Sequence, residues 1–264
     1  MLRRLSRKLQ NLQGIKQWSM EFIIVVFGVL LALWTQEWVK QLNDKETADI
    51  IAEAMDQDLL FMATGTMRRF SAQPCMLESL KNLATVVKTP NGEAFVKPPI
   101  AKATDESDAA FNTYYPVPLW SYYTRAFDRA IATGAFDHMS IEKVELYGEA
   151  YGWVVQMIEI EEAEDALTSR LAMVEMIELM DESTRLTLSR DIAALNGLNA
   201  SMLNSGRFLF ESMNKLGLRP SEENIELWHY INKRSQEVRG DCVQDFPLDF
   251  TGKYTGKSWT TSVN

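Results

Sequence analysis

The sequence predicts an all-α protein in which one N-terminal transmembrane helix continues into an extracytoplasmic helical bundle, followed by an irregular C-terminal tail. Residues 22–34 contain no charged or strongly polar side chain. Further along, apolar residues recur at spacings of three and four, and no alternating strand pattern occurs before residue 243. We therefore expect a basic segment at 1–17, a transmembrane helix at 18–40, a bundle at 41–242 and an extended tail at 243–264.

The first segment is basic and amphipathic. It contains no acidic residue, and its basic residues are Arg3, Arg4, Arg7, Lys8 and Lys16. Leucines at spacings of three and four line the opposite face, so we expect a helix lying on the inner leaflet, where anionic lipids attract it. The same pattern is typical of a mitochondrial presequence, which would place the protein in the mitochondrial inner membrane instead of a bacterial inner membrane, with the same topology.

The second segment, residues 18–40, is the predicted anchor. With its flanks the apolar stretch reaches about 19 residues, which at about 1.5 Å per residue covers close to the roughly 30 Å hydrocarbon core. Trp18, Trp34 and Trp38 lie at its ends, where indole rings favour the headgroup interface. The positive-inside rule puts the N-terminus in the cytoplasm and the bundle in the periplasm. A buried helix of a soluble protein is the alternative.

Three residues within the predicted anchor suggest helix contacts. Gly28 and Ala32 form a small-residue pair four positions apart, which would permit close approach of another helix. Glu21 either reaches the interface or pairs with a cation on a neighbouring subunit. We expect Glu21 and Ala32 to face a neighbouring transmembrane helix.

This region carries a family resemblance. The pattern consists of Glu21, Phe22, Gly28, Leu33, Trp34, Glu37 and Trp38, and a second stretch spans residues 122–151. Together they resemble a bacterial family of uncharacterised single-pass inner-membrane proteins with a Glu/aliphatic/Trp anchor and a helical exported domain. The resemblance implies membrane anchoring, a bacterial source and a helical domain, and it transfers no catalytic residue.

Apolar periodicity predicts the helices that follow. We expect the anchor helix to continue to about residue 70 and to stop at Pro74, with a short helix at 76–87 and a long loop at 88–118. Later helices are expected at 119–133, 140–180, 183–216 and 221–239, with Ser140 and Ser221 as N-caps and Gly134 and Gly217 as terminators.

The long loop ends in an aromatic cluster made of Phe111, Tyr114, Tyr115 and Trp120. These side chains either pack onto the bundle or form a surface on which a partner docks. The only cysteines, Cys75 and Cys242, lie at opposite ends of the bundle segment. In an oxidising compartment they are expected to form a disulfide, the alternative being two free buried thiols.

The sequence contains few signs of chemistry. It lacks a nucleophile elbow, a phosphate loop and a dinucleotide fingerprint. The Glu226-x-x-His229 spacing occurs in di-iron bundles, but it is not repeated, so no metal site is expected. An acidic cluster is expected to be solvated surface and consists of Glu159, Glu161, Glu162, Glu164 and Asp165. We predict no enzyme, no catalytic residue and no cofactor.

Charge and topology favour an interaction role. The chain has 27 Lys and Arg against 36 Asp and Glu; residues 1–40 hold 6 and 2 of these, so the remainder carries a net charge of −13. Such an acidic domain argues against nucleic acid as a partner. We expect an accessory or scaffolding subunit whose partners are membrane lipids and other membrane-protein subunits or a second copy. The alternative, a sensor or ligand-binding module, is disfavoured because the expected cytoplasmic segment holds no output domain.

Overall fold

A computed structural model describes residues 2–89, 114–118 and 120–245, except for the side chains of residues 2–21 and 23. Most of the predicted loop at 88–118, including Phe111, and most of the predicted tail at 243–264 therefore lie outside the described residues. The basic residues of the first segment, Trp18 and Glu21 have a described backbone only.

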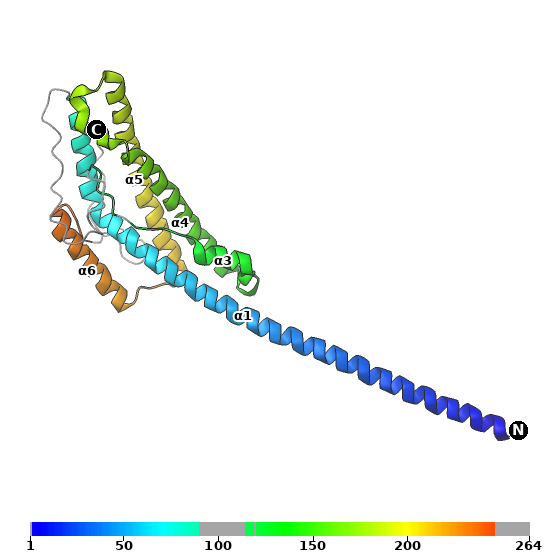
Figure 1. Cartoon of the computed structure of the whole chain (residues 1–264). Coiled ribbons are helices and arrows are strands. Elements are labelled where there is room, and N and C mark those ends of the chain that lie inside the picture. Colours follow the sequence, from blue (N-terminus) through cyan, green and yellow to red (C-terminus); the bar gives the residue numbers. More distant parts are fainter. Residues whose placement is uncertain (1, 90–113, 119, 246–264) are drawn as a thin grey trace.

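The described residues contain helices and no strand, so the all-α class is confirmed. The helices are α1 (Leu2–Lys88), α3 (Arg125–Thr133), the 3-10 helix η1 (Ala135–His138), α4 (Ile141–Thr168), the 3-10 helix η2 (Leu171–Leu179), α5 (Glu182–Lys215) and α6 (Glu222–Arg239). Helix α1 is 87 residues long. Its N-terminal part projects from the bundle as a single rod, and its C-terminal part bends and lies within the bundle (Figure 1).

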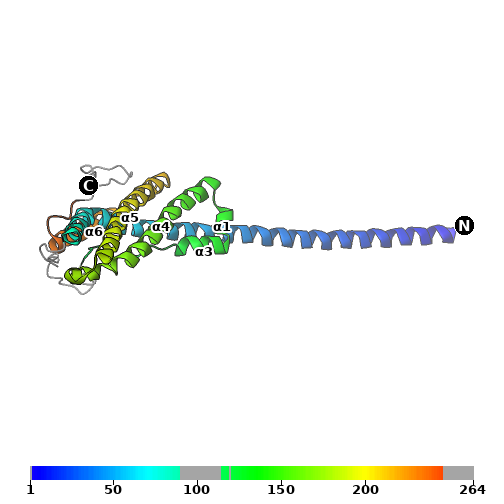
Figure 2. The same cartoon turned by 90° about the horizontal axis from the view of Figure 1, so that it is seen from above.

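The bundle is assembled around the C-terminal half of α1. Helices α4 and α5 pack against each other, and α5, α6, α3 and η1 contact α1. Viewed from above, these elements gather at one end of α1 and leave the other end uncovered (Figure 2). Among the α1 side chains that the structure describes, Ala48 is the first that is buried.

Two apolar clusters form the core. One joins α1 from Ala48 to Phe70 with α3, α4, α5 and α6, and the other joins α1 from Ala72 to Val87 with η2, α5 and Tyr115. The two clusters follow each other along α1, so the bundle is stabilised by burial along about half the length of this helix.

The predicted helix ends are confirmed where they depend on local chemistry. The Ser140 hydroxyl accepts a hydrogen bond from the Lys143 backbone N–H at 3.3 Å, and the Ser221 hydroxyl accepts one from Asn224 at 3.2 Å. Gly134 has φ 71°, a left-handed conformation that closes α3 and that favours glycine. These two caps and the glycine terminator depend only on residues close to them in the sequence, which is why the sequence predicts them.

The prediction that Pro74 ends the first helix is wrong, because α1 continues through it to Lys88. Proline has no N–H to donate to the carbonyl four residues earlier, that of Phe70. A segment far along the chain replaces the lost donor: the Gln244 side chain donates to the Phe70 carbonyl at 3.5 Å, and the Gln244 backbone N–H donates to the Ser71 carbonyl at 3.0 Å. The proline is tolerated because tertiary structure satisfies the backbone.

Two other helices differ from their predicted bounds. The helix expected at 140–180 ends at Thr168 and is followed by η2. Leu171, Val174 and Ile177 are buried at a constant spacing of three, close to the three residues per turn of a 3-10 helix, and the backbone kinks at Met176 before the last of them. Helix α3 begins at Arg125 and not at residue 119; Tyr122, just before it, is held by its hydroxyl 3.3 Å from that of Thr66.

Candidate functional site

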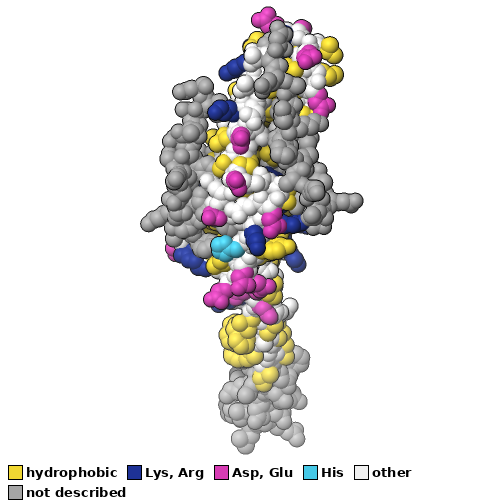
Figure 3. Space-filling model, turned by 90° about the vertical axis from the view of Figure 1, so that its left-hand side faces the viewer, with side chains coloured by type: hydrophobic (Ala, Val, Ile, Leu, Met, Phe, Trp, Pro, Cys, Tyr) yellow, Lys and Arg dark blue, Asp and Glu magenta, His cyan; other side chains and the backbone are white. Residues whose placement is uncertain are grey.

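The part of α1 outside the bundle exposes large apolar side chains around its whole circumference. Four consecutive residues, Ile24 to Phe27, cover a full helical turn and are 39–65% exposed. The others with the same character are Phe22, Val29, Leu30, Leu31, Leu33, Trp34, Trp38, Val39 and Leu42. No described element of this chain covers this apolar rod (residues 22–42), which Figure 3 shows as apolar surface below a band of acidic side chains.

The residues of the predicted anchor lie along this rod. Gly28 and Ala32 are exposed, and no atom lies within 4 Å of a Cβ built on Gly28. Trp34 is 70% exposed and Trp38 is 55% exposed. Within the described residues, no helix contains a stretch both long and apolar enough to cross a membrane.

Acidic residues follow the apolar rod where α1 enters the bundle. Glu46 and Asp49 are exposed, and the Asp44 carboxylate lies 3.9 Å from Nε2 of His138 in η1. The side chain of His138 is 34% exposed. The end of the bundle nearest the rod is thus polar and acidic, in contrast to the rod itself.

Three of the four aromatic residues predicted as docking candidates are described, namely Tyr114, Tyr115 and Trp120, and they pack into the bundle. Tyr115 is fully buried and Tyr114 is 7% exposed. The partly buried Trp120 ring lies on Gly65, where an added Cβ would come within 2.0 Å of it. The Trp120 ring also packs against the Phe61 ring in a tilted arrangement, with ring centroids 4.7 Å apart. Tyr114 and Tyr115 therefore offer no surface to a partner, and the packing alternative describes all three residues.

A buried ion pair, which the sequence did not predict, links α1 to α4. Arg69 donates to both carboxylate oxygens of Glu164, at 2.8 and 2.5 Å, and also to Asn199 Oδ1 at 3.3 Å. Tyr115 donates its hydroxyl to Glu164 at 3.3 Å. The two charged side chains are 5% and 2% exposed, so the prediction that Glu164 is solvated surface is wrong.

This polar group separates the two apolar clusters. Along α5, Leu195 belongs to one cluster and Met202 to the other, with Asn199 between them. Burial lowers the pKa of the Arg69 guanidinium, but Glu164, Tyr115 and Tyr122 together outweigh burial and raise the pKa, so this arginine stays charged. Burial raises the pKa of the Tyr115 hydroxyl, which keeps its proton for the bond to Glu164. The arrangement fixes the register of α1, α4 and α5.

Glu161 lies one turn before Glu164 on α4. Its partial burial, together with the nearby charges of Asp165 and Glu164, raises its pKa from 4.5 to about 7, and the charge of Arg69 opposes that rise. A carboxyl group with this pKa changes charge close to neutral pH. Glu161 is therefore a group beside the buried Arg69–Glu164 pair whose charge changes near neutral pH.

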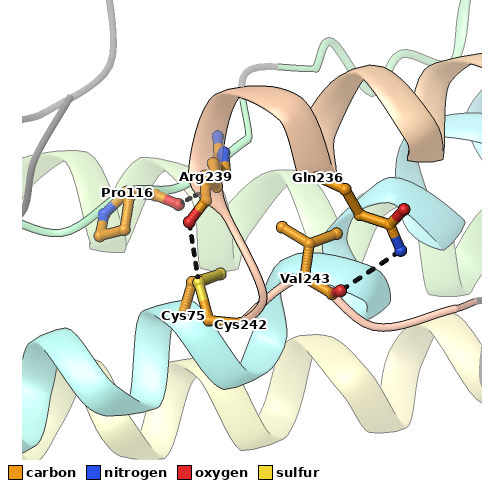
Figure 4. Close-up of a disulfide and its surroundings, with 6 residues drawn as sticks. All are labelled: Cys75, Pro116, Gln236, Arg239, Cys242 and Val243. Carbon is orange, nitrogen blue, oxygen red and sulfur yellow. Dashed lines mark hydrogen bonds between the residues drawn. A yellow bond between two sulfur atoms is a disulfide. The ribbon is translucent and has the colours of Figure 1, made fainter. Parts of the chain in front are cut away.

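The predicted disulfide is confirmed. Cys75 and Cys242 are joined with an S–S distance of 2.05 Å, across a sequence separation of 167 residues. It fastens residues 240–245, here called the C-terminal strap, to α1 next to Pro74. Figure 4 shows the strap, with the Cys242 sulfur 3.4 Å from the Arg239 carbonyl and Gln236 bonded to the Val243 carbonyl at 3.5 Å.

A pocket lies between α1 and α6. It has a volume of about 170 Å³. Its lining consists of Arg68, Tyr230, Ile231, Arg234, Ser235, Val238 and Arg239. Local sequence patterns do not reveal this pocket, because Arg68 comes from α1 and the other residues come from a helix more than 150 positions further along the chain.

The described residues hold no group of three or more His, Cys, Asp or Glu side chains arranged as metal ligands. Comparison of the chain with protein families, curated proteins and solved structures finds no match. The resemblance to single-pass inner-membrane proteins therefore stays a prediction from the N-terminal and central motifs.

Proposed function

We propose that this chain is a single-pass, membrane-anchored accessory or scaffolding subunit of an inner-membrane complex, with no catalytic activity of its own. The observation that carries the proposal is the apolar rod of α1, which exposes a full turn of large apolar side chains and continues without a break into the bundle. Exposed apolar surface on this scale marks an interaction site for lipid or protein. In this proposal, lipid and the helices of partner subunits cover the rod.

Two further features support the topology. The basic residues before the rod put the N-terminus in the cytoplasm by the positive-inside rule. The Cys75–Cys242 disulfide supports a location of the bundle in an oxidising compartment such as the periplasm. Because α1 is one helix through both parts, the bundle is held at a fixed position relative to the anchor.

Fractionation of membranes tests the anchor. The full-length chain is expected to stay in the membrane pellet after an alkaline carbonate wash. Val26→Arg combined with Leu30→Arg is expected to release it, since each arginine at the centre of a membrane helix costs about 2.5–3.5 kcal/mol. Ile50→Arg with Leu186→Arg, at exposed positions in the bundle, is the matched control and is expected to stay in the pellet. Extraction of the unaltered chain by carbonate would contradict the anchor.

Isolation in a mild detergent tests the accessory role. A chain tagged at its C-terminus is expected to bring down a defined partner, or a second copy, in fixed stoichiometry. A monomer without a partner in native membranes would contradict the accessory role while leaving the anchor intact. In that case the alternative, an extracytoplasmic sensor or ligand-binding module, gains support from the pocket between α1 and α6.

A further inference from the structure

The turn between α3 and α4 forms the end of the bundle nearest the apolar rod. It comprises residues 131–143, here called the tip, which contain the last turn of α3, η1 and the first turn of α4. His138 in η1 lies 3.9 Å from the Asp44 carboxylate, and Ala135 belongs to the same apolar cluster as Ala48. Figures 1 and 2 both show this turn beside the place where the uncovered part of α1 begins.

Helix α4 begins at the tip and follows α1 in the same direction, away from the rod. The Tyr147 hydroxyl lies 3.3 Å from the Ala52 carbonyl, and the Tyr151 hydroxyl donates to the Met55 carbonyl at 3.3 Å. Later residues of α4 thus contact later residues of α1. Ile141 precedes Tyr147 by six residues, which places it at about the level where α1 enters the bundle.

The tip exposes two isoleucine side chains. Ile141 is 78% exposed and Ile131 is 59% exposed. Because the Cα–Cβ bonds of a helix tilt toward its N-terminus, the Ile141 side chain at the start of α4 is directed toward the rod end of the bundle. Removing a large aliphatic side chain from water contributes about 1.5–3 kcal/mol, so a surface that covers the tip at this level gains free energy.

The rise of α1 sets the distance between the tip and the proposed membrane. Trp38 lies at the outer end of the predicted anchor, and Asp44 follows it by six residues, which is about 9 Å along a helix axis. The headgroup layer on each side of a bilayer is about 5–7 Å thick. Since α1 is one helix through both residues, the tip is held at the outer surface of the headgroup layer.

The charges at this level select the kind of headgroup. Residues 44–49 of α1 and the tip contain five carboxylates against two lysines. The carboxylates belong to Asp44, Glu46, Asp49, Asp137 and Glu142, and the lysines are Lys45 and Lys143. Anionic lipids attract basic segments and therefore repel this acidic end of the bundle. Zwitterionic headgroups instead offer a cationic ammonium group that the carboxylates can approach.

We infer that the tip contacts the headgroup layer of a zwitterionic phospholipid bilayer, with Ile131 and Ile141 entering the layer and the neighbouring carboxylates facing its ammonium groups. The inference rests on the anchor in the proposed function, because without that anchor no bilayer lies at this level. It adds a second point of contact beside α1. Two contacts with the membrane fix the tilt of the bundle, which a single helix leaves free.

Quenching of a fluorescent label by nitroxide lipids tests this contact. Both native cysteines are in the disulfide, so one introduced cysteine takes the label alone. Ile141→Cys places it on the tip. Leu179→Cys, at an 86% exposed position in η2, is the matched control, because η2 packs against the far end of α1. Leu30→Cys, at a 58% exposed position on the rod, reports on the anchor.

The labelled full-length chains are reconstituted into phosphatidylcholine vesicles whose nitroxide is either on the headgroup or deep in the acyl chains. Both leaflets carry the quencher, so the direction of insertion does not alter the result. Headgroup nitroxide is expected to quench the label at position 141 several-fold more than the label at position 179. Acyl-chain nitroxide is expected to quench the label at position 30.

The outcomes separate the tip from the anchor. Quenching at position 30, with no more quenching at position 141 than at position 179, would overturn the inference and leave the anchor intact. Absence of quenching at position 30 would overturn the anchor and the inference with it. In vesicles rich in phosphatidylglycerol, an anionic lipid, quenching at position 141 is expected to fall while quenching at position 30 is unchanged. Equal or stronger quenching at position 141 there would overturn the assignment to zwitterionic headgroups.

Discussion

The two halves of α1 reverse the usual relation between polarity and burial. In the N-terminal half, the side chains of Phe22 and Trp34 are each 70% exposed. In the C-terminal half, the side chain of Arg69 is 5% exposed and its partner Glu164 is 2% exposed. Both halves belong to one unbroken helix. Burial is therefore set by what packs against each half: helices α3 to α6 cover the C-terminal half, and no described element of this chain covers residues 24–42.

The largest effect is expected from breaking the buried ion pair. Arg69→Met leaves the Glu164 charge buried without its cation and is expected to lower the free energy of unfolding by about 3–5 kcal/mol. Chemical denaturation of the full chain in micelles measures this. Adding Glu164→Leu is expected to restore most of the loss, because the uncompensated charge is then removed.

A second ion pair serves as the control for this prediction. Arg170 and Asp191 lie 2.7 Å apart, but the Arg170 side chain is 45% exposed. Arg170→Met is therefore expected to change stability far less than Arg69→Met. A double variant, Arg69→Met with Glu164→Leu, that is as unstable as Arg69→Met alone would contradict the explanation by an unpaired charge.

The same substitution in each half of α1 tests the comparison directly. Leu59 is completely buried and Leu30 is 58% exposed. Leu59→Ala is expected to lower the free energy of unfolding of the bundle by about 2–5 kcal/mol, from lost burial and the cavity left behind. Leu30→Ala is expected to leave it unchanged in the same denaturation experiment. Equal losses would mean that this bundle covers the rod at Leu30.

A pair of glycines on α5 tests how closely α1 and α5 approach. A Cβ on Gly206 would lie 2.6 Å from both Phe70 and Thr66, whereas nothing lies within 4 Å of one on Gly197. Gly206→Ala is expected to destabilise the bundle by about 1–3 kcal/mol through overpacking. Gly197→Ala is expected to stabilise it by about 0.5–1 kcal/mol, because alanine is the better helix former. Thermal unfolding followed by circular dichroism measures both stability changes. A change of the same sign in the two variants would contradict the close approach of α1 and α5 at Gly206.

The smallest expected effect is a dependence of stability on pH from Glu161. Its pKa is about 7 in the folded chain against an ordinary 4.5, so the folded state binds the proton more tightly than the unfolded state. Its contribution to stability is complete below about pH 4.5 and is lost as the pH rises through about 7. Glu161→Gln is expected to raise the free energy of unfolding by about 1–2 kcal/mol at pH 8, a value reduced for partial exposure, and to have little effect at pH 4.

Glu159→Gln, at an exposed position two residues earlier, is the control for this pH experiment and is expected to leave the pH profile unchanged. Denaturation curves collected from pH 4 to pH 8 provide the measurement. A Glu161→Gln variant that keeps the full slope between pH 5 and 7 would show that another group titrates there.

The sequence predicted the features that depend on neighbouring residues and missed those that depend on distant ones. Ser140 and Ser221 cap helices through the N–H group three residues later, and Gly134 ends α3 through its own backbone. The disulfide was predictable because Cys75 and Cys242 are the only cysteines. Such features need no knowledge of the packing.

The missed features need partners far along the chain. The sequence predicted Glu164 to be solvated surface because four other acidic residues lie near it in the sequence. Its cationic partner, Arg69, lies 95 positions away. The sequence predicted Pro74 to end the first helix, because the donor that replaces the missing proline N–H belongs to Gln244, 174 positions from the Phe70 carbonyl that accepts it. The pocket between α1 and α6 likewise has one of its arginines on another element. Local patterns do not contain these pairings.

The C-terminal strap has a consequence for the order in which the molecule is assembled. Cys242 emerges from the ribosome 167 residues after Cys75, when α3 to α6 have already been synthesised. Until then the Phe70 and Ser71 carbonyl groups lack the donors of Gln244 that compensate for Pro74. These contacts of α1 are thus completed by the last described segment of the chain. A nascent chain interrupted before residue 242 would lack both the covalent bond and these hydrogen bonds, which distinguishes it structurally from the finished protein.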